Sequence, residues 1–139
     1  MSATRPDAAL IAALNEALDD EYRAFATYDQ VLADFGEVRP FSNIRDSEGR
    51  HIDALHRIYR RLHLDIPPNP WPGRVPRFPS IAAACEAAAQ GEVDNLAMYR
   101  RLKTSTDDPE ILRVFENLET ASRERHLPAF RRCAERHGR

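Results

Sequence analysis

The chain has 139 residues, of which 42% are apolar and 30% are charged, and its formal net charge is −2. This length and apolar content predict one compact domain, residues 1–139, with a buried core. The charge argues against nucleic acid or an anionic membrane as a partner. The first 14 residues hold no apolar run long enough for a signal sequence or a membrane span, so we expect a cytoplasmic protein.

Apolar residues recur every three or four positions in four segments, and no segment shows the alternation typical of a strand. The predicted fold class is therefore all-α, with helices over about 7–35, 41–63, 80–103 and 109–136. Gly36 is a natural residue just past a helix end, Ser80 is a good N-cap, and Asp108 followed by Pro109 is a typical helix start.

The second and third helices are separated by "LDIPPNPWPGRVPRFPS", which holds six of the ten prolines and cannot be helical. An extended connection at roughly 3.3 Å per residue spans about 50 Å. A helix of about 20 residues is only about 30 Å long, so the connection can cross the whole bundle. We therefore expect two helical hairpins joined by a long crossover, with the second and third helices parallel, in a four-helix bundle.

The stretch "FSNIRDSEGRHIDAL" places two polar residues in the middle of a core-facing stripe. Glu48 and His51 fall between Phe41, Ile44 and Leu55 at helical spacing. An unpaired carboxylate there would cost several kcal/mol or would take up a proton. Something in the core must therefore receive these two side chains.

An internal repeat supplies further acids. Glu92 follows Glu21 by 71 positions, as Tyr99 follows Tyr28 and Glu119 follows Glu48. Four carboxylates meeting at one level of a bundle repel each other unless cations or protons neutralise them. Iron, manganese or zinc would accept carboxylate oxygen and imidazole nitrogen together, and His51 shares a helix face with Glu48. The pattern predicts two divalent metal ions, most simply iron.

On these motifs the chain resembles the ferritin-like di-iron carboxylate proteins, whose pattern is a Glu on each of two helices and Glu-x-x-His on each of the other two. It resembles in particular small uncharacterised bacterial ferritin-like domains with "F-x-N-I-x-x-S-E-x-x-H" and a late "A-S…H-L-x-A-F", written here "FSNIRDSEGRH" and "ASRERHLPAF". The resemblance covers nearly the whole chain. It implies the following metal ligands: Glu21 and Glu92 as outer ligands, Glu48 and Glu119 as bridging ligands with a catalytic role, and His51.

The second half departs from this pattern, because Ser122 stands where a histidine is expected. His126 lies seven residues beyond Glu119, which is about 10.5 Å along a regular helix. One ion could take both only if the helix were bulged, and Pro128 makes a bulge possible. An alternative alignment matches the second predicted helix to residues 74 positions later in the last helix. It sets Ser122 opposite Glu48 and, with one extra residue, brings His126 level with His51. We favour the offset of 71 residues, because it places all four acids at equivalent helical positions. We keep His126 as a candidate metal ligand.

The resemblance implies a dinuclear non-haem iron protein that reacts with dioxygen or peroxide, as a ferroxidase, peroxidase or oxidase. The alternatives are a non-enzymatic site for zinc, manganese or iron, and a metal-free interaction bundle. We expect a monomer or small homo-oligomer and no storage cage. We also expect Asn95 to hydrogen-bond near the metals, Tyr28 and Tyr99 to fill the core, and Cys85 and Cys133 to be free buried thiols.

Overall fold

The computed structural model describes residues 6–138, and their regular structure is helical throughout. Helix α1 (Ala8–Phe35) begins where the Asp7 carboxylate accepts a 2.8 Å hydrogen bond from the Leu10 N–H. It ends at Gly36, whose φ of 89° is a conformation that glycine adopts without steric cost. The short turn that follows leads directly into the second helix.

The remaining elements are α2 (Phe41–Arg61), α3 (Ile81–Leu102), the 3₁₀ turn η1 (Lys103–Ser105), α4 (Pro109–Ala121), the π-helical turn η2 (Ser122–His126) and α5 (Leu127–His137). The Ser80 hydroxyl accepts from the Ala83 N–H at 3.1 Å, and Asp108 caps the start of α4. The segment predicted as the fourth helix is thus continuous but contains a π-helical turn. This turn decides the geometry of the site described below.

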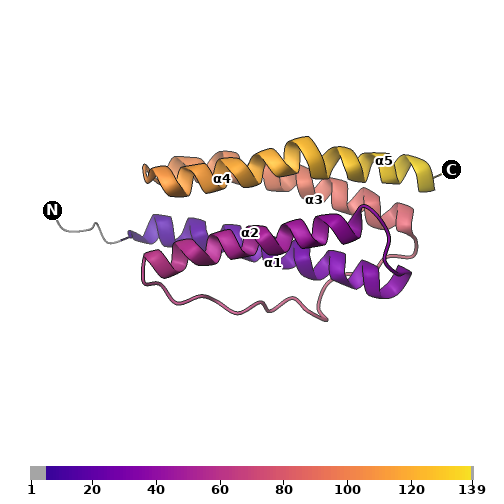
Figure 1. The fold of residues 1–139 in the computed structure, drawn as a ribbon, viewed down its shortest axis with the longest axis horizontal. Coiled ribbons are helices and arrows are strands. Elements are labelled where there is room, and N and C mark those ends of the chain that lie inside the picture. Colours follow the sequence, from indigo (N-terminus) through magenta and orange to yellow (C-terminus); the bar gives the residue numbers. More distant parts are fainter. Residues whose placement is uncertain (1–5, 139) are drawn as a thin grey trace.

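The helices form two antiparallel hairpins, one made of α1 and α2 and the other of α3 with α4 and α5. Figure 1 shows the connection after α2 running the length of the molecule, so that α2 and α3 point the same way. The prediction of an all-α four-helix bundle with a proline-rich crossover is therefore confirmed.

Hydrogen bonds hold the crossover against α1. The Tyr22 hydroxyl donates to the Pro67 carbonyl at 2.6 Å, and the indole N–H of Trp71 donates to Asp19 at 2.9 Å. Further along, the Arg77 guanidinium pairs with Asp34. These contacts explain how a segment without helices stays close to the bundle.

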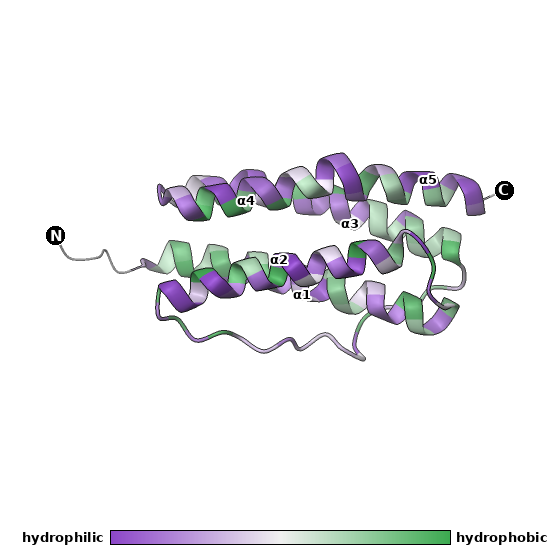
Figure 2. Ribbon diagram, viewed as in Figure 1, coloured by the Kyte–Doolittle hydropathy of each residue, from purple (hydrophilic) through white to green (hydrophobic). Residues whose placement is uncertain are grey.

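Two apolar clusters fill the core. Helices α1, α2 and α3 contribute to both, whereas α4 contributes to the first cluster and α5 to the second. One cluster includes Leu14, Leu18, Leu55, Tyr99 and Phe115. The other includes Leu32, Phe41, Ile44, Cys85 and Phe130. Figure 2 shows hydrophobic and hydrophilic residues interleaved along the helices, as expected for helices with one buried face. Within residues 6–138, no helix is both long and apolar enough to cross a membrane.

Cys85 and Cys133 are joined in a disulfide between α3 and α5, with their Cα atoms 5.9 Å apart. The expectation of two free thiols was therefore wrong. The residues are 48 positions apart in sequence, and only the antiparallel packing of these helices brings them together. Both are fully buried in the second apolar cluster, so the bond also fills core volume.

Candidate metal centre

Helices α1, α2 and α3 and the π-helical turn η2 carry buried polar side chains on their inward faces. The structure brings five of the predicted metal-ligating residues together there, and all are buried: Glu21, Glu48, His51, Glu92 and His126. They form two groups of three in which the ligand atoms lie within 4.8 Å of one another. Glu48 belongs to both groups, so its carboxylate lies between the two halves of the molecule.

The first group combines α1 and α2. His51 Nδ1 lies 3.4 Å from Glu21 Oε1 and 3.7 Å from Glu48 Oε1. His51 follows Glu48 by three residues, so the two share one face of α2. This is the arrangement predicted from the Glu-x-x-His spacing.

The second group adds α3 and the π-helical turn to the same glutamate. His126 Nδ1 lies 3.1 Å from Glu48 Oε1 and 3.3 Å from Glu92 Oε1. The rings of His51 and His126 stack at 5.6 Å between centroids and 23° between planes. Both Nδ1 atoms therefore approach one carboxylate oxygen from neighbouring rings.

The π-helical turn explains how His126 reaches this position. The Leu127 N–H donates to the Ser122 carbonyl five residues back, where an α-helix would use a carbonyl four residues back. The turn thereby accommodates one extra residue, which agrees with the register offset of 74. Pro128 favours this local change because it has no N–H to give to Glu124.

The offset of 71 therefore does not extend to the last helix, and the structure does not bring Glu119 into either group. Its carboxylate instead lies 2.5 Å from Lys103 Nζ and 3.4 Å from the Arg123 guanidinium. The residue level with Glu48 is Ser122, whose hydroxyl donates to Asn95 at 2.7 Å. Glu119, which the resemblance implied as a bridging ligand, is thus buried in an ion pair outside both groups.

Hydrogen-bond donors from both hairpins surround the two groups. Tyr28 donates to Glu92 Oε2 at 2.7 Å, and Tyr99 donates to Glu21 Oε2 at 2.6 Å. Burial raises the pKa of both hydroxyls well above the usual value, so they remain donors at neutral pH. The expected core-filling tyrosines therefore also orient the two outer carboxylates.

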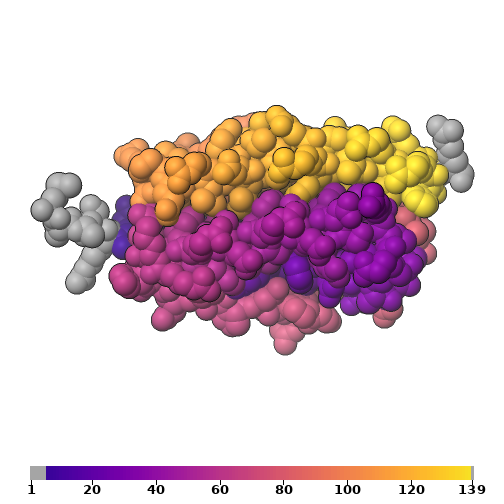
Figure 3. All heavy atoms as spheres, in the orientation of Figure 1, coloured from indigo at the N-terminus to yellow at the C-terminus, as the bar shows by residue number. Residues whose placement is uncertain are grey.

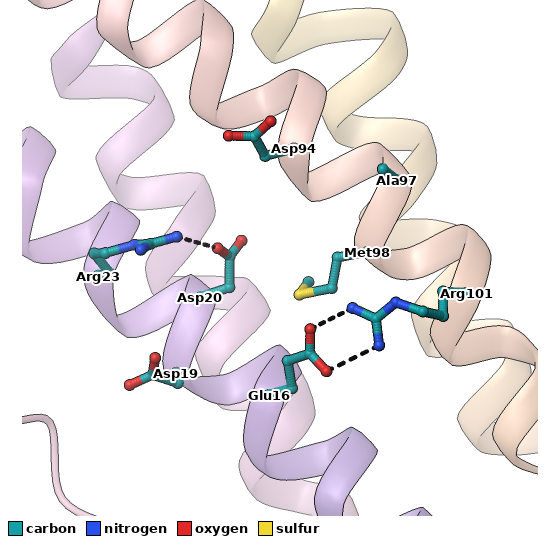
Figure 4. Close-up of a pocket in the computed structure, with 8 residues that line it drawn as sticks. All are labelled: Glu16, Asp19, Asp20, Arg23, Asp94, Ala97, Met98 and Arg101. Atoms are coloured by element: carbon teal, nitrogen blue, oxygen red, sulfur yellow. Dashed lines mark hydrogen bonds and ion pairs between the residues drawn. The ribbon is translucent and has the colours of Figure 1, made fainter.

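Asn95 links this region to the surface. Its amide nitrogen donates to Asp20 at 2.8 Å and lies 3.4 Å from Glu21 Oε2. Asp20 also accepts from Arg23 at 2.9 Å in the hollow drawn in Figure 4. Burial and the charge of Glu21 raise the pKa of Asp20 to about 6. Asn95 thus makes the hydrogen bonds expected of it.

Sequence reasoning did not single out Asp20 or Ser47. The Ser47 hydroxyl lies 3.1 Å from His126 Nε2 and 3.5 Å from His51 Nε2, so it contacts the far side of both rings. Both residues immediately precede a predicted ligand in sequence, Glu21 and Glu48, and lie beside the apolar stripe. Their position next to a predicted ligand was the feature of the sequence that could have identified them.

The two central carboxyls of the first group differ in protonation. Burial favours the neutral form of Glu21, but hydrogen bonds from Glu48 and His51 outweigh it and lower the pKa of Glu21. Burial, and then the charge of Glu21, raise the pKa of Glu48 well above its usual range. This shift favours the protonated form of Glu48 in the metal-free protein, and a metal ion would have to displace that proton.

The donor set fits divalent metal ions. Glu92 Oε1 and His126 Nδ1 are buried and have no hydrogen-bond partner, although buried polar atoms almost always have one. They lie 3.3 Å apart on facing helices. Three carboxylates and two imidazoles form a ligand set suited to iron, manganese or zinc.

No protein-family model matches the sequence, and no curated protein matches it either. The fold is similar to the crystal structure of hypothetical protein MJ0754 from Methanococcus jannaschii DSM 2661, with a TM-score of 0.82 and 22% sequence identity. The match covers 99% of this chain and 86% of that chain. This likeness supports the helical fold over the whole chain.

Proposed function

We propose that the chain is a ferritin-like protein that binds two divalent metal ions, iron in the cell, and reacts with dioxygen or peroxide. One observation carries the proposal: His51 Nδ1 and His126 Nδ1 lie 3.7 Å and 3.1 Å from the same oxygen of Glu48. Two imidazoles that approach one buried carboxylate could each supply a nitrogen to a separate ion, with the carboxylate shared between the two ions.

Glu21 and His51 would hold one ion, Glu92 and His126 would hold the other, and Glu48 would be shared between them. Bound ferrous ions would supply the electrons for reduction of the oxidant. The chain's contribution is to hold the five donors in place, with Tyr28 and Tyr99 orienting the outer carboxylates.

The apolar clusters on both sides of the site also contribute. They exclude water from the carboxylates and lower the local dielectric, which strengthens their attraction for a cation. The unpartnered atoms of Glu92 and His126 would gain a ligand that the apoprotein does not provide.

The test is an anaerobic Fe(II) titration of purified, metal-stripped protein, followed by oxygen-uptake measurement, with Glu48→Gln as the matched variant. Two irons per chain and oxygen uptake above that of free Fe(II) are expected for the wild type only. Stable zinc or manganese binding without oxygen uptake would favour a non-enzymatic metal site. Absence of binding by any divalent ion would overturn the proposal and leave a metal-free bundle.

A further inference from the structure

A cavity of about 380 Å³ lies between α1, α3 and the last part of the crossover. Its walls are largely small or apolar: Ala24 and Thr27 from α1, Ala88 and Gly91 from α3, and Pro76 and Phe78 from the crossover. On the face drawn in Figure 3, by contrast, the atoms of α2 meet those of α4 and α5 along their length. The lining of the cavity includes Tyr28 and Glu92, so it adjoins the site from the α1–α3 side.

The cavity reaches the candidate metal centre. Glu92 and Tyr28 are among its lining residues, and they are joined by the 2.7 Å hydrogen bond between the tyrosine hydroxyl and Glu92 Oε2. Both side chains are at least nine-tenths buried. A molecule in the cavity would thus have its inner end beside a metal-ligating carboxylate.

Gly91 lies at the exposed rim of this cavity. It lies in the interior of α3, where glycine costs about 1 kcal/mol relative to alanine. A Cβ added at Gly91 would meet nothing within 4 Å, so close packing does not require the glycine. A side chain at this position would project into open space at the rim of the cavity.

The charges around the cavity restrict its occupant. Three acids line it, Asp20, Glu92 and Asp94, against one cation, Arg23, whose guanidinium is already bonded to Asp20 at 2.9 Å. The adjacent hollow in Figure 4 has the same character, because Arg101 pairs with Glu16 there. An organic anion would be repelled, whereas an apolar body would fit against Phe78 and Ala88.

We propose that this cavity binds an uncharged, mostly apolar organic molecule that carries a hydroxyl group, with the hydroxyl beside Glu92 and Tyr28. The inference rests on the proposed function for the identity of the centre next to the cavity, and it adds the chemical class of molecule that reaches that centre. The binding itself depends on residues of α1, α3 and the crossover, and so can be measured with or without metal.

The experiment is a titration of ¹⁵N-labelled full-length protein, metal-free and zinc-loaded, with benzyl alcohol and with benzoate. Benzyl alcohol should give saturable amide shifts at Thr27, Ala87 and Gly91, and benzoate should bind at least tenfold more weakly. Absence of saturable shifts, shifts confined to other surfaces, or equal binding of benzoate would each overturn the inference.

Variants locate the binding. Ala87→Leu and Gly91→Leu should each weaken benzyl alcohol binding at least fivefold, because both positions line the cavity. Val93→Leu is the matched control, an exposed position on α3 that lines a different hollow, and it should leave binding unchanged. An unchanged affinity in both cavity variants would contradict the inference.

Zinc stoichiometry, measured on the same samples, separates this inference from the proposed function. Alcohol binding without zinc uptake would support the cavity and sink the metal centre. Zinc uptake without alcohol binding would leave the metal centre and overturn the cavity as a binding site.

Discussion

The hydroxyl of Tyr28, on α1, donates a 2.7 Å hydrogen bond to Glu92 on α3. The reciprocal bond runs from Tyr99 on α3 to Glu21 on α1, at 2.6 Å. Each outer carboxylate is therefore oriented by a tyrosine from the other hairpin. The geometry of both groups depends on how the two hairpins dock.

Replacing either tyrosine by phenylalanine leaves a buried carboxylate oxygen without its donor. We expect Tyr28→Phe and Tyr99→Phe each to lower the free energy of unfolding by about 1–3 kcal/mol. Urea denaturation of the metal-free variants measures this. Both should also weaken zinc binding, whereas Tyr59→Phe, which loses a bond to Asn15, should not.

Glu48→Gln should separate stability from metal binding. The raised pKa of Glu48 favours the protonated form of this residue in the metal-free protein, and glutamine imitates that neutral form. The unfolding free energy without metal should therefore change by less than about 1 kcal/mol. The increase in melting temperature on adding zinc should be lost, because both groups share this carboxylate.

Glu119→Gln is the matched control for Glu48→Gln. It changes a buried glutamate of the same bundle that pairs with Lys103 and belongs to neither group. Metal stoichiometry and the zinc-induced rise in melting temperature should both survive. Loss of one metal in this variant would show that Glu119 is a metal ligand and would contradict the offset of 74 in the last helix.

Deleting Arg125 tests the π-helical turn. Arg125 is exposed within η2, and a π-helical turn is equivalent to one extra residue in an α-helix. Removal of Arg125 should restore α-helical hydrogen bonding in this segment. The buried faces of α4 and α5 should keep their relative orientation, and His126 would then follow Ser122 by three positions. We expect a folded protein that still binds zinc, as checked by circular dichroism and titration.

Deletion of Asn117, an exposed residue of α4, is the comparison for the Arg125 deletion. That part of the helix has no extra residue to absorb the change, so buried Phe115 and Leu118 would rotate by about 100° relative to each other. The Asn117 deletion should therefore be strongly destabilised. Equal damage from both deletions would argue against the π-helical turn.

The pKa of Asp20 gives a pH dependence with a definite sign. Because this pKa is raised to about 6 in the folded protein, the folded state binds the proton more tightly than the unfolded chain. Protonation of Asp20 therefore contributes fully to the free energy of unfolding below about pH 4. This contribution, of up to about 3 kcal/mol, is lost as the pH rises through about 6. Asp20→Asn should remove this part of the pH dependence from urea denaturation of the metal-free protein.

The disulfide should contribute measurably to stability. It closes a loop of 48 residues, for which the chain-entropy relation gives about 4 kcal/mol. Dithiothreitol should lower the wild-type melting temperature and leave the Cys85→Ala/Cys133→Ala double variant unaffected. Detection of two free thiols in unreduced, denatured protein would refute the disulfide.

Periodicity and capping residues predicted most of the fold. Ser80 and Asp108 begin their helices as expected, and the same periodicity placed Glu21, Glu48 and Glu92 on inward faces. These features are local, because each depends on residues within one or two turns of a helix.

The last helix shows where such reasoning fails. Counting at 3.6 residues per turn assumes an unbroken α-helix, and one extra residue rotates everything beyond it by about 100°. Pro128 was the available sign of a bulge, but it does not specify its length. The Cys85–Cys133 bond was missed for a different reason, since pairing across 48 residues is decided by tertiary packing.

The placement of the disulfide also determines how the molecule would respond to being stretched. Tension applied at the two ends of the chain would pass directly from Cys85 to Cys133 and would bypass residues 86–132. Glu92 and His126 lie inside this shielded loop, whereas Glu21, Glu48 and His51 lie outside it. A single-molecule pulling experiment should therefore extend the first hairpin and tear Glu48 away from His126, while Glu92 and His126 stay within a segment that bears no load.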